Sequence, residues 1–133
     1  MTYLSSFQNL IWLDLSGTQI TDCGMQHAAS LNKLFSLAMR ETAVGDPGLR
    51  RLSHLSALEF IELHATRVSD VGCAAIASMP ALTNAFLQFN RLTDACVNLL
   101  AQSRSLKYVN LCKTEVTATG AHELKNLGWT VDV

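Results

Sequence analysis

Residues 10–20 read Leu-Ile-Trp-Leu-Asp-Leu-Ser-Gly-Thr-Gln-Ile, a pattern of the form L-x-x-L-x-L-x-x-T-x-I. Related copies begin at Leu34, Leu58, Leu82 and Leu106, so the period is 24 residues with no insertion or deletion. A fixed period in the twenties is typical of solenoids, in which each repeat buries its apolar residues against its neighbours. The sequence therefore predicts a stack of repeats.

Each repeat has two halves with different periodicities. Residues 10–16 alternate apolar and other side chains, which predicts a short strand. In the second half apolar residues recur at helical spacing, as at Leu49, Leu52 and Leu55. Strand, loop and short helix together predict a right-handed α/β solenoid. Because helices need more width than strands, we expect one parallel sheet on the concave face and short helices on the convex face.

The 24-residue frame predicts a single domain, 1–133. Residues 1–9, beginning at Met1, match the helical half of a repeat whose strand half is absent. Complete repeats are expected at 10–33, 34–57, 58–81, 82–105 and 106–129, and a terminal strand at 130–133. Because the chain starts with half a repeat and finishes with a lone strand, we expect either a fragment of a longer solenoid or a chain that associates through its edge strands.

Three loop positions repeat with the same residue types. Aspartate stands at Asp22, Asp46, Asp70 and Asp94, where we expect it to cap the helix that follows in its own repeat. Two residues later come Gly24, Gly48, Gly72 and Gly120, with Cys96 as the exception. We expect these glycines to ease the turn into the helix. A short polar side chain follows each strand and is expected to bond from turn to turn as a ladder. These residues are Thr18, Thr42, Thr66, Asn90 and Thr114.

These repeats resemble the leucine-rich repeat (LRR) family over nearly the whole chain. The segment at 13–24, Leu-Asp-Leu-Ser-Gly-Thr-Gln-Ile-Thr-Asp-Cys-Gly, is most similar to 24-residue bacterial and protist repeats with Thr in place of Asn. It is also similar to the cysteine-containing and GALA-type repeats of ubiquitin-ligase adaptors. The resemblance implies a horseshoe fragment that binds macromolecules through its concave face without catalysis. These 133 residues contain no F-box-like segment, so the resemblance does not support the full adaptor role.

The strand residues that alternate with the buried ones are expected to face outward. Aromatic side chains are interleaved there with polar and charged ones, which is typical of binding hot spots. We expect the aromatic members to anchor a protein or peptide partner and the charged members to set its register. The alternative is that the aromatic rings pack on one another and cover the sheet. The candidate residues are Trp12, Asp14, Arg40, Phe60, Glu62, His64, Phe86, Gln88, Tyr108 and Asn110.

The predicted face is small. Five strands at ~4.8 Å, with about five residues in each, span roughly 400 Å², below the ~800 Å² per partner of a standard interface. The sheet alone is therefore expected to bind weakly. Either loops add to the interface, or the chain is a structural stacking segment of a longer LRR protein or of a homo-oligomer. A substrate-binding region like those of ubiquitin-ligase adaptors belongs to this second hypothesis.

Composition argues against several other classes of protein. The net charge is −1, with 49% hydrophobic and 16% charged residues, so no basic excess favours nucleic acid. The arginines Arg67 and Arg91 are expected to be solvated. No apolar run approaches the ~20 residues of a membrane span. The first residues lack the features of a secretory signal, so we expect an intracellular, cytoplasmic protein.

Metal, cofactor and enzyme signals are weak. The four cysteines are expected to be free thiols that pack as small apolar residues. Cys23 and His27 supply two ligands, fewer than a structural zinc site needs. His64 and Cys112 are predicted to lie two strands apart, too far for proton transfer. No phosphate-binding glycine loop occurs in the sequence, so we expect no cofactor and no catalytic activity.

Overall fold

The computed structural model describes residues 2–133, and Met1, which the sequence assigns to the first half-repeat, lies outside the described residues. The strands are β1 (Trp12–Asp14), β2 (Ser36–Ala38), β3 (Phe60–Glu62), β4 (Asn84–Phe86), β5 (Tyr108–Asn110) and β6 (Thr130–Asp132). The helices are η1 (Thr2–Ser6), η2 (Asp22–Gly24), α1 (Met25–Ala28), α2 (Asp46–Leu52), α3 (Gly72–Ser78), α4 (Asp94–Leu100) and α5 (Ala118–Asn126).

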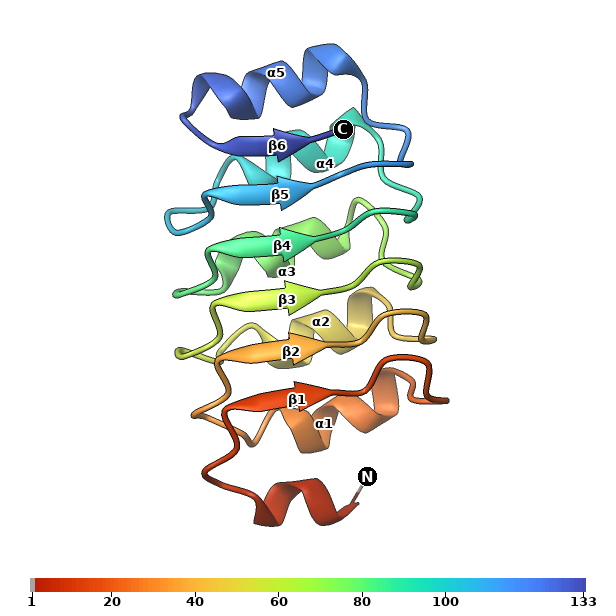
Figure 1. Cartoon of the computed structure of the whole chain (residues 1–133), viewed down its shortest axis with the longest axis vertical. Coiled ribbons are helices and arrows are strands. Elements are labelled where there is room, and N and C mark those ends of the chain that lie inside the picture. The colour runs from red at the N-terminus through yellow and green to blue at the C-terminus, as the bar shows by residue number, and fades with distance from the viewer. Residues whose placement is uncertain (1) are drawn as a thin grey trace.

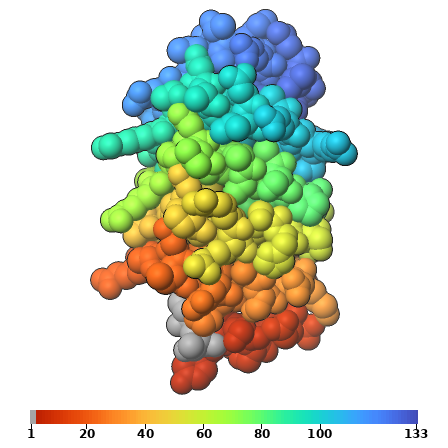
Figure 2. All heavy atoms as spheres, turned by 180° about the vertical axis from the view of Figure 1, so that it is seen from behind, coloured from red at the N-terminus to blue at the C-terminus, as the bar shows by residue number. Residues whose placement is uncertain are grey.

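The six strands form one parallel sheet in the order β1-β2-β3-β4-β5-β6. Figure 1 shows the strands side by side in one layer, the helices in a second layer behind them, and the two chain ends at opposite ends of the long axis. Seen from behind, in Figure 2, the repeats follow one another in chain order along that axis. The predicted α/β solenoid with one parallel sheet is confirmed.

The strand register follows the sequence period. Leu37 pairs with Ile61, and Ile61 with Ala85, so each partner lies 24 residues further on. The last pair, Val109 with Val131, differs by 22 residues, and β6 is therefore reached two residues early. Gly128 ends the preceding helical segment with a φ of +87°, a left-handed conformation that glycine adopts readily.

The core lies between the sheet and the helices. Leu37, Ile61, Ala85 and Val109, the central residues of β2 to β5, have no exposed surface. Each such aliphatic side chain stabilises the stack by ~1.5–3 kcal/mol when fully buried. Leu13, the equivalent residue of β1, is half-buried because no described strand precedes it.

The repeated aspartates bond to the next repeat, so the prediction that they cap their own helices is wrong. Asp22 Oδ1 accepts hydrogen bonds from the backbone N–H groups of Gly45, at 2.7 Å, and Gly48, at 3.0 Å. Asp70 accepts from the N–H of Thr93 at 2.8 Å and from its hydroxyl at 2.7 Å. The same pair of bonds joins Asp46 to Ser69 and Asp94 to Thr117. The carboxylates therefore tie successive repeats together.

The repeated glycines make room for these carboxylates. A Cβ atom at Gly72 would lie 2.3 Å from Asp46 Oδ1, and one at Gly120 would lie 2.3 Å from Asp94 Oδ1. Neither glycine has a positive φ, so the predicted role in easing the turn is wrong. These positions need glycine because the aspartate of the preceding repeat approaches the helix so closely.

The threonines that follow the strands close their own turns. The hydroxyls of Thr42 and Thr66 each donate to the carbonyl three residues earlier, at 2.8 Å. Within residues 2–133, the predicted ladder forms only between Thr66, whose hydroxyl lies 3.1 Å from Asn90 Oδ1, and Asn90, which bridges two repeats. The Nδ2 atom of Asn90 donates to the carbonyls of Leu63 and Leu87, and its Oδ1 accepts from the N–H of Thr66. No such bond joins Thr18, Thr42 or Thr114 to a neighbouring turn in the same range.

Candidate functional site

The outward-facing aromatic residues form two groups on the open face of the sheet, the face opposite the helices. Trp12 is 72% exposed at the β1 edge. Phe60 packs against Phe35 with ring centroids 5.2 Å apart. A shallow cavity of about 240 Å³ is lined by Trp12, Phe35, Ser36 and Phe60, and we call it the aromatic cavity.

The second group contains Phe86 and Tyr108, whose ring centroids are also 5.2 Å apart. The Tyr108 hydroxyl donates to Asp132 Oδ2 at 2.6 Å, and this bond is the main reason that the pKa of Tyr108 is raised above its ordinary value. These two rings cover each other, as the alternative hypothesis expects, whereas Trp12 lies open.

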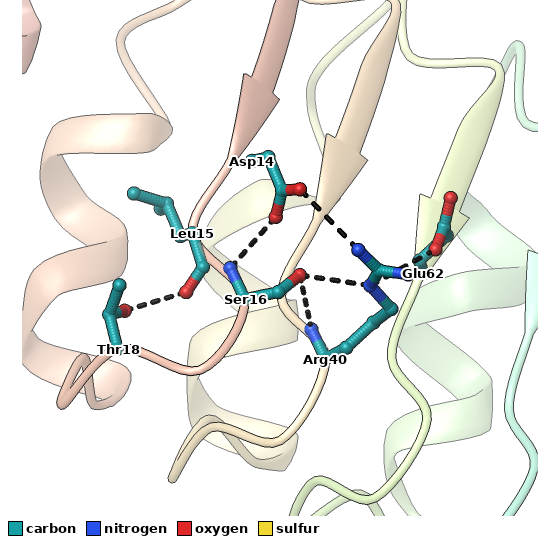
Figure 3. A network of polar contacts seen from close by, with 6 residues as sticks. All are labelled: Asp14, Leu15, Ser16, Thr18, Arg40 and Glu62. Carbon is teal, nitrogen blue, oxygen red and sulfur yellow. Dashed lines mark hydrogen bonds and ion pairs between the residues drawn. The ribbon is translucent and has the colours of Figure 1, made fainter.

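A charged network lies beside the aromatic cavity, at the ends of β1, β2 and β3 (Figure 3). Arg40 Nε donates to Ser16 Oγ at 3.1 Å and lies 3.5 Å from Glu62 Oε2. Arg40 Nη2 lies 3.5 Å from Asp14 Oδ2. The side chain and backbone of Ser16, followed by Arg40, lower the pKa of Asp14. One cation thus lies between two carboxylates, which leaves this part of the face with a net negative charge.

The remaining predicted residues do not join this network. No hydrogen bond or ion pair of the His64 ring is present within residues 2–133. The Oε1 atom of Gln88 is buried and has no hydrogen-bond partner in the same range. Asn110 Oδ1 accepts from the N–H of Cys112 at 3.0 Å and so bonds within its own strand end.

Sequence reasoning missed Phe35 and Asp132. Phe35 precedes β2 at a position that the strand alternation does not assign to the open face, although its ring lines the aromatic cavity. Asp132 lies in β6, which is displaced by two residues from the 24-residue frame. The signal was the likeness of the Val-Asp-Val sequence at 131–133 to Leu13-Asp14-Leu15, because this likeness places Asp132 at the outward position of Asp14.

Within residues 2–133, no group of three or more His, Cys, Asp or Glu side chains could hold a metal ion. No helix in that range is both long and apolar enough to cross a membrane. All four cysteines are free. Cys73 is buried beside Cys96, and this neighbour, followed by burial, raises the pKa of the Cys73 thiol.

Comparison with solved structures identifies the fold. A crystal structure of an internalin (inlF) from Listeria monocytogenes superposes with a TM-score of 0.59 and 20% sequence identity over 86% of this chain. Internalins are leucine-rich repeat proteins. The chain has the leucine-rich repeat fold. A second LRR structure, internalin C2 from the same organism, matches with a TM-score of 0.48 and 16% identity, covering 98% of this chain and 72% of its own.

The likeness concerns the LRR fold and not a partner. This chain spans 38% of the length of the first internalin. No protein-family model and no curated protein sequence matches the chain.

Proposed function

We propose that this LRR chain is a non-catalytic protein-interaction module that binds a protein or peptide through the open face of its sheet. The observation that carries the proposal is the exposed ring of Trp12 beside the aromatic cavity. Large aromatic side chains with open apolar surface are the usual anchors of protein interfaces. Contiguous exposed apolar surface is also unfavourable in water and therefore commonly marks an interaction site.

The surroundings of the aromatic cavity fit this role. Asp14 and Glu62 lie two residues after Trp12 and Phe60 on the same strands, so a charged rim adjoins the apolar anchors. A polar rim around an apolar centre is the usual arrangement of an interface. The parallel register of β1, β2 and β3 holds these side chains on a rigid support, which lowers the entropy lost on binding.

The proposal is tested by capture from cell extract with matched variants. The double variant Trp12→Ala/Phe60→Ala removes two of the three aromatic rings that line the aromatic cavity while leaving the fully buried core residues unchanged. Val71→Ala is the control, because Val71 is 65% exposed and precedes α3, away from the sheet face. We expect proteins retained by the wild type and the control to be lost by the double variant, with unchanged circular dichroism. Equal retention by all three proteins would refute the proposal.

A second candidate function is structural stacking, in which the β1 edge pairs with another repeat. Leu13 and Leu15 are half-buried at this edge, whereas the corresponding Leu37 and Met39 are fully buried in the next repeat. Sedimentation at several concentrations tests this function. Self-association that Leu13→Lys abolishes would support stacking, and a monomer at all concentrations would count against stacking between copies.

A further inference from the structure

A second hollow lies at the edge of the sheet, where the loops after β3 and β4 emerge on the right of Figure 1. It has a volume of about 440 Å³ and we call it the rim hollow. Arg67 and Arg91 occupy the same position in neighbouring repeats, and isolated parallel bridges continue the strand ladder into both loops. The bridges pair Gly45 with Arg67 and Ser69 with Arg91, so Arg91 lies opposite Ser69, two residues after Arg67. The lining residues are Thr66, Arg67, Val68, Ser69, Phe89 and Arg91.

The two arginines have no protein partner for their charge. Both are exposed, and within residues 2–133 neither guanidinium group has a hydrogen bond or an ion pair. Arg40 on the sheet face differs, because it lies between two carboxylates. Glu115, which follows Arg91 by one repeat, forms no ion pair with it over the same range. Two like charges that line one hollow without a counter-charge favour an incoming anion.

The other side-chain donors around the rim hollow are already used. The N–H of Thr66 donates to Asn90 Oδ1, and its hydroxyl donates to the carbonyl of Leu63. Both the N–H and the hydroxyl of Ser69 donate to Asp46. An incoming anion would therefore bind through the guanidinium groups, whose planar donor pairs match a carboxylate.

Phe89 gives the rim hollow an apolar wall. Its side chain is 60% exposed, and its φ is +60°. The equivalent positions Gly17, Glu41, Ala65 and Lys113 also have positive φ, so the repeat imposes this backbone. A bulky residue is disfavoured in that conformation. Phe89 presents an exposed ring in the same hollow as the two arginines, and its packing within the chain does not require a phenylalanine at this position.

We propose that the rim hollow binds an acidic segment of a protein, with a carboxylate held by Arg67 and Arg91 and a neighbouring apolar side chain packed on Phe89. This inference goes beyond the proposed function, because it concerns a separate surface and a stated ligand chemistry. A nucleic acid or an anionic membrane fits less well. Those ligands favour broad basic surfaces, whereas this chain has a net charge of −1.

The test measures binding of two short peptides by nuclear magnetic resonance titration of the full chain. One peptide carries two glutamates next to a leucine, and the other carries glutamines in their place. We expect the acidic peptide to bind at least about tenfold more tightly, a difference of ~1.4 kcal/mol, and to shift the backbone resonances around residues 66–69 and 89–91. Equal affinity for the two peptides would overturn the proposal.

Matched variants locate the effect. Arg67→Gln/Arg91→Gln should remove the preference for the acidic peptide, and Phe89→Ala should weaken its binding. Arg50→Gln/Arg51→Gln changes the charge equally at two exposed positions of α2 and should keep the preference. An equal loss in both double variants would show a general charge effect and overturn the proposal.

Two further measurements distinguish binding at the rim hollow from binding elsewhere on the chain. Trp12→Ala/Phe60→Ala should leave the acidic preference intact, so that failure of sheet-face binding and failure of this inference are distinguishable. A single-stranded oligonucleotide that binds more tightly than the acidic peptide, and loses this affinity in Arg67→Gln/Arg91→Gln, would assign the rim hollow to nucleic acid and overturn the proposal.

Discussion

Replacing Gly72 by alanine should separate the third repeat from the second. The new Cβ atom would lie 2.3 Å from Asp46 Oδ1, a distance that forces the carboxylate to move. Asp46 would then lose its bonds from the N–H and the hydroxyl of Ser69. Bonds to a charged group contribute ~1.5–3 kcal/mol each, and the lower end applies here because the carboxylate is half-exposed.

The expected cost of Gly72→Ala is therefore about 3 kcal/mol, reduced by ~1 kcal/mol because alanine favours a helix over glycine. A net loss of about 2 kcal/mol is a large part of the ~5–15 kcal/mol that stabilises a domain. Urea unfolding followed by circular dichroism at 222 nm measures this loss. Because a repeat stack depends on contacts between neighbours, a smaller slope of free energy against urea would show that the two halves unfold separately.

A double-mutant cycle decides whether the carboxylate is the cause. In the Asp46→Ala background the clash is absent, so Gly72→Ala should cost almost nothing or should stabilise the helix. The coupling free energy between the two sites should therefore be about 2 kcal/mol or more. The same cost in both backgrounds would refute the explanation, and so would a Gly72→Ala protein as stable as the wild type.

Three further predictions follow from the hydrogen bonds between repeats and at the end of the sheet. The hydroxyl and N–H of Thr117 lower the pKa of Asp94 below 3.8. The stability that this carboxylate contributes is therefore present above that pH and is lost as the pH falls through the folded pKa. In urea unfolding from pH 6 to pH 2, the Asp94→Asn variant should lose less stability on acidification than the wild type. Asn90 is 5% exposed and bridges two turns, so Asn90→Ala should destabilise the protein by ~2–4 kcal/mol in urea unfolding. Asn90→Thr should destabilise it by less, because threonine still closes its own turn. Asp132→Ala should move the pKa of Tyr108 back towards 10.0 in an absorbance titration at 295 nm, with Tyr108→Phe identifying its signal; an unchanged titration would contradict the bond.

The sheet was predictable because the period determines which residues become neighbours. A frame without insertions places Leu37 beside Ile61 and Ile61 beside Ala85, and the observed strand pairs follow it. The alternation within each strand then assigns one face to the core and one to solvent. β6 departs from the frame because α5 and Gly128 bring the chain back to the sheet two residues early.

The roles of the loop residues were predicted wrongly because local rules consider neighbours in sequence. An aspartate before a helix ordinarily caps that helix. In this stack the nearest free N–H groups belong to the following repeat, and Asp22 reaches Gly45 and Gly48 across 23 and 26 residues. The close approach then explains why glycine is needed at position 48, where a Cβ atom would lie 2.6 Å from Asp22 Oδ1.

The sequence predicted which face of the sheet carries the candidate site, but it did not predict which aromatic residues pack together there. Strand alternation identifies Trp12, Phe60 and Phe86 as outward residues, yet it cannot say that Phe60 packs on Phe35 while Phe86 packs on Tyr108. Those contacts depend on side-chain rotamers and on the twist between neighbouring strands. The same limit applies to Arg40, which contacts carboxylates on both sides of its own strand.

The repeats of one chain can be compared with one another, and this comparison separates structure from interaction. Where they agree, as at Leu37 and Ile61, every copy meets the same neighbours, so the same packing requirement recurs. The outward and rim positions have no such requirement and are free to differ. Arg67 and Arg91 share a position with Gln19, Ala43 and Glu115 in the other repeats, so the fold does not require arginine there. Two cations that line one hollow at such a position are consistent with the proposed acidic ligand, and the rim hollow and the aromatic cavity are therefore the surfaces to test.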